Sequence, residues 1–304
     1  MKWRSSYLDE IRGTLEPTKT TFRMWKGRRI AEKKPIPRQP NTFTQVYQRA
    51  KFRMALASWK TLGIDEKEYW KAEAGKIGLD GHQLYISKYI TEMLNPAAEW
   101  LFEDGNGTVL TDYSHNGNNG NIKGAQWVKL ETEKWALSFN GVNNRVLIPH
   151  NDLFNTENGT ILVWLKIRRY SSEISSTYQY SGIFMRGRQL WFRINNDVLA
   201  FYISAYGAYR GTPPAVTTLD KDKFYFCSAR WKYESGATTW ETLLNAKLEG
   251  TKSYAGVIDF ITNFGFIGYS YYIDGVIGFV AFFRKYLNDE EISAFYNLTK
   301  PFFS

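Results

Sequence analysis

The sequence predicts a mainly β protein whose body is an antiparallel sandwich, preceded by an extended basic arm and a small helical module. Three observations support this prediction. After residue 96, short segments rich in β-branched and aromatic residues follow one another with no helical crossover between them. Residues 41–95 instead carry apolar side chains at helical spacing, and residues 1–40 are rich in lysine, arginine and proline.

The N-terminal segment holds most of the positive charge. The 304-residue chain has 39 Lys+Arg against 30 Asp+Glu, a net charge of +9. Residues 1–40 contain 11 basic and 4 acidic residues (+7), residues 41–95 contain 8 and 6 (+2), and residues 96–304 contain 20 and 20 (0). The body is therefore neutral, and the excess charge belongs to the arm.

The arm, residues 1–40, shows neither helical nor strand periodicity, and Pro35, Pro37 and Pro40 exclude regular structure at its end. Aromatic residues such as Trp25 are interleaved with its cations, so we expect the arm to lie on nucleic acid or on a neighbouring subunit. A mobile charged tail is the alternative. The basic residues expected to make the contact are Arg23, Lys26, Arg28, Arg29, Lys33, Lys34 and Arg38.

Residues 41–95 predict three short helices. Apolar side chains three and four positions apart indicate the first helix over residues 42–62. Asp65 is expected to cap the second, with Glu68 completing a capping box, and Asp80 to cap the third. The aromatic residues expected to pack between these helices are Trp59, Trp70 and Tyr85. We interpret residues 41–95 as a packing or docking module.

Residues 96–304 predict the sandwich. Eight segments have strand composition and are separated by Asn-Gly, Asn-Asn, Gly-x-Gly and Pro-Pro breakers. They are residues 135–139, 145–148, 160–167, 189–194, 198–204, 224–231, 239–244 and 264–269. One helix is expected near the end, capped by Asn288 with Glu291 at its third position.

Several stretches of the body follow one another in the order of a known family. They are residues 100–102 and 110–120, residues 136–146 and 160–166, and residues 273–280 running to 287–292. On these stretches, residues 99–298 resemble the laminin-G-like, concanavalin A-like lectin/glucanase domains. The resemblance implies a jelly-roll sandwich, a fold that serves lectins, hydrolases, adhesins and inert spacers alike.

A second resemblance concerns the helical module. It rests on Trp59-Lys60-Thr61-Leu62, Asp65-Glu66-Lys67, Trp70, and Gly81-His82-Gln83-Leu84-Tyr85-Ile86. This pattern is similar to a helical segment of phage and archaeal-virus structural proteins.

The body departs from the family at two places that would supply metal ligands. The family's Phe-Asp-Gly is Phe139-Asn140-Gly141 here, and its Ile-Asp-Glu is Ile277-Gly278-Phe279. Both changes remove carboxylates, which a calcium site needs, so no cofactor is expected. Asp112, with the loop of residues 116–121, is the remaining weak candidate for a calcium ligand; its alternative role is that of a turn residue.

Catalytic groups are sparse, and we expect no enzyme activity. A glycosidase needs two carboxylates across the scissile bond, and the candidates are Glu131 with Glu133, and Asp220 with Asp222. Neither pair lies within an aromatic strand. The three histidines, His82, His115 and His150, are isolated in the sequence, and the single cysteine, Cys227, forms no intrachain disulfide.

Tyrosines gather in one part of the body, next to Gly182, Gly207 and Gly211. Rings beside loop amides suit stacking on sugar rings, although the same residues can pack the core or a subunit contact. The residues expected to contact a glycan are Tyr178, Tyr180, Tyr206 and Tyr209, with Tyr202 in the same cluster.

The first functional hypothesis is a virion structural protein, a capsid or surface protein that assembles with copies of itself and other virion proteins. Its arm would contact viral DNA or subunits. The alternative is a carbohydrate-binding adhesion module that attaches to host-surface glycans, and a glycoside hydrolase comes third. With no signal peptide or apolar span in the sequence, assembly is expected in the host cytoplasm.

Overall fold

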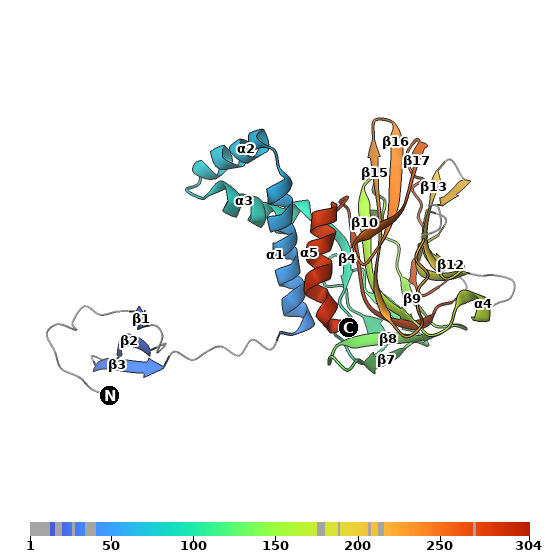
Figure 1. The fold of residues 1–304 in the computed structure, drawn as a ribbon, viewed down its shortest axis with the longest axis horizontal. Helices are drawn as coiled ribbons and strands as arrows, with labels where there is room; N and C mark the ends of the chain where they lie inside the picture. Colours follow the sequence, from blue (N-terminus) through green and yellow to red (C-terminus); the bar gives the residue numbers. More distant parts are fainter. Residues whose placement is uncertain are drawn as a thin grey trace. The chain divides into compact units, whose positions relative to one another are not determined.

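The structure of the chain is a computed structural model (Figure 1). It describes residues 13–15, 20–25, 28–33, 41–174, 180–187, 189–205, 208–211, 216–269 and 272–304. The chain divides into two compact units, Met1–Asn41 and Thr42–Ser304, and each is described by itself. Among the described residues, no helix is long and apolar enough to cross a membrane.

In the first unit, the described residues form three short antiparallel strands in the order β1-β2-β3. They are β1 (Gly13–Leu15), β2 (Thr20–Trp25) and β3 (Arg28–Lys33). The expectation of an arm without regular structure is therefore wrong for these residues. Trp25 pairs with Arg28, so only two residues, the second of them Gly27, separate β2 from β3. A glycine in a two-residue connection favours a hairpin. The sequence nevertheless does not predict β2 and β3, because residues 1–40 show no strand periodicity.

The second unit begins with the predicted helices, α1 (Phe43–Thr61), α2 (Ile64–Gly75) and α3 (Gly81–Lys88), followed by a π-helical turn η2 (Tyr89–Met93). The predicted cap of α3 is confirmed, because the Asp80 side chain accepts a hydrogen bond from the backbone N–H of His82. The predicted cap of α2 is wrong.

The helix α2 starts two residues earlier than Asp65 would allow. Gly63 is its N-cap, and the Glu66 carboxylate accepts the Gly63 N–H at 3.0 Å. Asp65 and Glu66 both lie in the first turn of the helix, where they interact favourably with its dipole. Glycine at the cap accounts for the error, because the prediction relied on a side-chain cap.

Two antiparallel sheets form the body, as predicted. The first sheet has the order β17-β16-β15-β10-β19-β8-β7, with β4 also paired to β19. Its strands are β4 (Pro96–Trp100), β7 (Gln126–Lys129), β8 (Trp135–Asn140), β10 (Gly159–Ile167), β15 (Phe224–Glu234), β16 (Ala237–Leu244), β17 (Lys247–Ala255) and β19 (Asp274–Phe283).

The second sheet has the order β14-β13-β12-β11-β18-β9-β6-β5. Its strands are β5 (Val109–Leu110), β6 (Gly120–Lys123), β9 (Arg145–Ile148), β11 (Tyr180–Arg186), β12 (Leu190–Asn195), β13 (Val198–Ala205), β14 (Ala208–Gly211) and β18 (Gly265–Ile267). The short helices η3 (Asp152–Phe154), α4 (Ser171–Ile174) and η4 (Lys300–Phe302) lie in connections or near the end of the chain.

The eight predicted strand segments each overlap a strand of the structure. The prediction misses others, among them β17 and β19. β17 is mostly exposed, so its side chains do not alternate between core and solvent, and β19 is buried at all ten positions, so it shows no period of two.

One hydrophobic core fills the space between the two sheets. Strand β10 sends Ile161, Val163 and Leu165 into this core. Large side chains from both sheets and their connections complete it, among them Phe184, Phe192, Phe201, Trp231 and Phe282. Face-to-face packing of this kind defines a sandwich.

A second core lies on the opposite face of the first sheet, under α1 and α5 (Asp289–Thr299) (Figure 1). From the sheet, Trp164, Phe226 and Phe279 point into it. Tyr47 of α1 lies 5.6 Å from Phe279, and Phe295 of α5 lies 5.6 Å from Phe226, measured between ring centroids. The helical segment thus shares its core with the sandwich.

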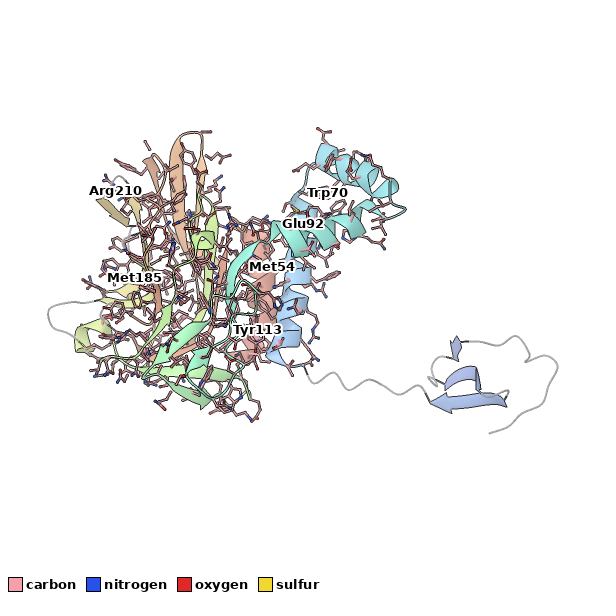
Figure 2. All side chains as sticks on the ribbon, turned by 180° about the vertical axis from the view of Figure 1, so that it is seen from behind. Met54, Trp70, Glu92, Tyr113, Met185 and Arg210 are labelled. Carbon is pink, nitrogen blue, oxygen red and sulfur yellow. The ribbon has the colours of Figure 1, made fainter. Side chains whose placement is uncertain are left out.

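The α5 cap is confirmed, since the Asn288 side chain accepts the Glu291 N–H and the Glu291 carboxylate accepts the Asn288 N–H. The predicted aromatic contacts between the helices are confirmed as well. Tyr85 lies 5.2 Å from Trp59 and 5.3 Å from Trp70, which Figure 2 labels among α2 and α3.

One buried ion pair joins α1 to the first sheet. The Lys51 ammonium on α1 lies 2.6 Å from Oε1 and 2.7 Å from Oε2 of Glu99 on β4. The side chains are 11% and 1% exposed. Removing one partner of such a pair leaves the other charge buried and uncompensated.

We predict that Glu99→Gln lowers the free energy of unfolding by about 3 kcal/mol, because the Lys51 charge loses its counter-charge. The matched control is Glu68→Gln, which removes the exposed pair with Lys71 and should change stability by less than about 1 kcal/mol. Urea denaturation measures both variants. Equal losses in the two variants would contradict a tethering role for the buried pair.

A second buried cation, Lys134, makes stability depend on pH. Its ammonium donates hydrogen bonds to the carbonyls of Leu101, Phe102 and Trp135, and lies 3.0 Å from Glu103. Burial lowers the pKa of Lys134 to about 8, although Glu103 opposes the shift. Above that pH the folded protein has released this proton while the unfolded chain still holds it.

We therefore predict that Lys134 makes the unfolding free energy rise with pH between about 8 and 10. The comparison is wild type against Lys134→Met, and the difference in unfolding free energy between them should change by about 2 kcal/mol across this range. The measurement stops at pH 10 because buried tyrosines, such as Tyr89, affect stability at higher pH. A constant difference would show that Lys134 does not titrate there.

Candidate functional site

The outer face of the second sheet carries the site. Strand β12 points Leu190, Phe192 and Ile194 into the core, so Trp191 and Arg193 lie on the other face. Figure 2 labels Met185, the register partner of Trp191, on the side of the sandwich away from Met54 of α1. This face is therefore the one that the helical layer leaves open.

Three rings surround one guanidinium on this face. The central carbon of the Arg193 guanidinium lies 4.1 Å from the ring centroid of Tyr180, 4.3 Å from that of Trp191 and 4.2 Å from that of Tyr202. We call these four residues the aromatic face. Cation–π attraction to three rings holds the guanidinium in place without neutralising its charge.

Arg193 is only 8% exposed, yet among the described residues it makes no ion pair, and its Nε has no hydrogen-bond partner. A buried donor without an acceptor is costly, so such a group points to a ligand or to water. The three rings are partly exposed. The aromatic face thus offers ring surface around an unsatisfied donor.

Two glycines make room for this arrangement. Gly182 pairs with Arg193 across β11 and β12 and places no side chain beside the guanidinium. A Cβ on Gly211 would lie 2.3 Å from the Tyr202 ring, so the backbone of β14 packs directly against that ring. Gly182 and Gly211, two of the glycines next to the predicted tyrosine cluster, therefore leave room for the rings and the guanidinium.

The aromatic surface continues along the second sheet. Phe266 of β18 stacks on Tyr269 with ring centroids 4.4 Å apart. The Arg145 guanidinium lies 5.6 Å from the Tyr269 ring. An arginine beside aromatic rings thus occurs a second time on this sheet, with Phe266 on β18, two strands from β12, and Arg145 on β9, three strands from β12.

The structure places two members of the predicted tyrosine cluster. Tyr180 and Tyr202 both lie against the Arg193 guanidinium. Tyr178 and Tyr206 lie outside the described residues, and the backbone of Tyr209 pairs with Ser204 of β13. The prediction missed Trp191 and Arg193, although alternation along β12 places both on the face opposite the core.

The weak calcium candidate, Asp112, has a structural role. Its Oδ1 accepts the N–H groups of Glu99 and Ser114, and its Oδ2 accepts the Ser114 hydroxyl and the Asn118 N–H. These four hydrogen bonds occupy the carboxylate, so the residue fixes the loop of residues 112–119 to β4. Within the described ranges, no cluster of metal-ligating side chains is present.

Two of the glycosidase candidates form ion pairs with neighbouring lysines. Glu133 makes an ion pair with Lys129, and Asp220 with Lys223. The Tyr225 hydroxyl, followed by Lys223, lowers the pKa of Asp220, which is opposite to what a general acid needs. Glu131 and Asp222 line a cavity on the first sheet.

His82 and His150 each lie against other side chains in the described part of the chain. His82 lies 5.3 Å from the Trp59 ring. His150 faces the Arg186 guanidinium with Nδ1 and Asp152 with Nε2.

The arm cations fall partly on described backbone. Arg23 lies in β2, and Arg28, Arg29 and Lys33 lie in β3. Lys26, Lys34 and Arg38 lie outside the described residues. Anchoring of nucleic acid or subunits by these seven residues stays a prediction.

Comparison with solved structures finds a similar fold in a domain of an arabinanase and in the binding domains of two toxins. Domain 4 of AbnA, a GH43 extracellular arabinanase from Geobacillus stearothermophilus in complex with arabinotriose, aligns with a TM-score of 0.52 and 11% identity, over 66% of this chain and 98% of that domain. The binding domain of Paraclostridial mosquitocidal protein 1 aligns with a TM-score of 0.53 and 14% identity, over 67% and 52%.

The binding domain of botulinum neurotoxin DC in complex with SialylT aligns with a TM-score of 0.50 and 15% identity, over 67% of this chain and 51% of that one. The chain therefore spans about half the length of these toxin domains. At such identities the likeness concerns the fold. A comparison with curated proteins found no match.

A family profile gives the assignment. Residues 140–293 match the profile of the concanavalin A-like lectin/glucanases superfamily, which is half of the chain. The matched range includes all strands of the aromatic face and the central strands of both sheets. The chain belongs to the concanavalin A-like lectin/glucanases superfamily.

Proposed function

We propose that the protein is a carbohydrate-binding module that holds a sugar chain on the aromatic face. The observation that carries the proposal is Arg193, a nearly buried guanidinium that is surrounded by three rings and forms no ion pair among the described residues. Sugar rings present C–H groups on their faces and hydroxyl oxygens at their edges. Aromatic rings and an arginine donor match these two surfaces.

The neighbouring folds support a binding role over other roles. The structures that align include a domain in complex with arabinotriose and a toxin binding domain in complex with SialylT. Binding by the aromatic face requires no catalytic step, in agreement with the expectation of no enzyme activity. Attachment to host-surface glycans is the biological role that we propose for it.

We predict that the full chain binds a discrete set of sugars on a glycan array and that Trp191→Ala weakens this binding about tenfold or more, because one ring of the site is lost. Tyr209→Ala tests whether Tyr209, one of the residues expected to contact a glycan, takes part in binding. The matched control is Tyr69→Ala, which removes an exposed ring on α2.

Thermal melting confirms that each variant is folded before binding is compared. A blank array for the folded wild type, or equal loss in Tyr69→Ala, would rule out the aromatic face as the binding surface. Cleavage of a bound glycan that depends on Glu131 or Glu133 would replace the binding module with a hydrolase.

A virion structural role is a second proposal, and the charge partition favours it. A neutral body with a +7 arm suits a protein that attaches to DNA or to acidic subunits. The full chain would then assemble at high concentration, alone or with DNA. A chain that stays monomeric in both conditions argues against this role.

DNA contact by the arm is tested separately. If the arm neutralises phosphates, the logarithm of affinity falls with the logarithm of salt by about 0.9 per contact. Arg28→Ala combined with Arg29→Ala should then reduce the slope by about 1.8. The matched control is Lys232→Ala combined with Lys252→Ala in the body, and a slope that is unchanged by the arm variant would leave subunit anchoring as the arm's role.

A further inference from the structure

A cavity of about 770 Å³ lies on the outer face of the first sheet, beside the C-terminal end of α5. Its floor includes Lys166 of β10, Phe224 of β15 and Val276 of β19. Phe302 of η4 forms part of one wall. The volume falls within the range of small-molecule sites, roughly 300–1,000 Å³.

Lys166 is an anomaly on this floor. It follows Leu162 and Trp164 on the face of β10 that points into the second core, and its register partners are Phe224 and Val276. The ammonium lies 5.1 Å from the Phe224 ring, and no carboxylate of the described residues lies within 4 Å of it. A half-buried cation among apolar neighbours calls for an anion.

The lining of the cavity carries charges of both signs, because Lys129, Lys223 and Lys300 lie there together with Glu131 and Asp222. Glu131 lies between β7 and β8, and Asp222 lies just before β15. Both are exposed, and among the described residues neither forms an ion pair. Carboxylate oxygens accept hydrogen bonds from hydroxyl groups.

Asn245 and Phe302 add a further polar group and a further ring to the lining. Asn245 directs its Oδ1 to the N–H of Phe226, so its side-chain N–H groups are the part that can donate to a ligand. Phe224 and Phe302 are both partly exposed and supply apolar surface. Lys166 on its apolar floor, together with the hydrogen-bonding groups of the lining, matches a ring that has an acidic group and several hydroxyls.

We propose that this cavity binds an acidic sugar residue, with the sugar carboxylate on Lys166, the ring against Phe224 and Phe302, and hydroxyl groups donating to Glu131 and Asp222. The site lies on the first sheet and shares no residue with the aromatic face. The proposal of this cavity site therefore does not depend on the function proposed for the aromatic face.

Isothermal titration calorimetry of the full chain tests the proposal with four probes: glucuronate, glucose, benzoate and inorganic sulfate. Glucuronate is expected to bind, and the other three to bind at least about tenfold more weakly, because each lacks either the acid or the hydroxyls. Glucose that binds as well as glucuronate overturns the role of the acid. Benzoate or sulfate that binds as well overturns the role of the hydroxyls.

Variants locate the binding. Lys166→Met should weaken glucuronate about tenfold or more, while Lys252→Met, an exposed lysine on β17 of the same sheet, should leave it unchanged. Should Lys166→Met fail to fold, Lys166→Gln and Lys166→Arg pose the same question, with binding retained only by arginine. Glucuronate affinity that survives Lys166→Gln overturns the site.

The variants distinguish failure of the cavity site from failure of the aromatic face. Trp191→Ala should leave glucuronate binding unchanged, and Lys166→Met should leave the glycan-array pattern of the aromatic face unchanged. Glucuronate binding that is lost in Trp191→Ala and kept in Lys166→Met would place the acidic sugar on the aromatic face and overturn the cavity site.

Discussion

The burial of the first sheet on both faces is the constraint on which the rest of the second unit depends. Strands β10 and β19 pair at the centre of this sheet, and all ten residues of β19 are buried. One face of β10 points to the core between the sheets and the other to the core under α1 and α5. Without the helices, Trp164 and Phe279 would be exposed to water, at a cost of about 2–3 kcal/mol each.

Buried polar contacts join the helices to this sheet and to one another. The Lys51–Glu99 pair joins α1 to β4, and the Tyr89 hydroxyl and the Lys285 ammonium both reach Glu291 on α5, at 2.8 and 2.7 Å. Buried charges are satisfied in these places only while helices and sheet remain together. The helical layer and the sandwich therefore stabilise one another.

The same constraint separates the two candidate sites. Among the described residues, no helical layer covers the second sheet, and the aromatic face lies on its outer face. The first sheet is covered by helices over much of its outer face, and the cavity around Lys166 forms beside the end of that cover. In both places a cation lies beside aromatic rings, Arg193 on the second sheet and Lys166 on the first.

The sequence by itself determined the sandwich, the three N-terminal helices and the caps at Asp80 and Asn288, because periodicity and capping are local properties. It also placed Tyr180 and Tyr202 in one cluster. The tertiary structure alone decided that Trp191 and Arg193 join them, that Asp112 fixes a loop, and that Lys166, Glu131 and Asp222 share a cavity. These residues come from different strands and connections, so their proximity depends on strand order and register, which no local pattern encodes.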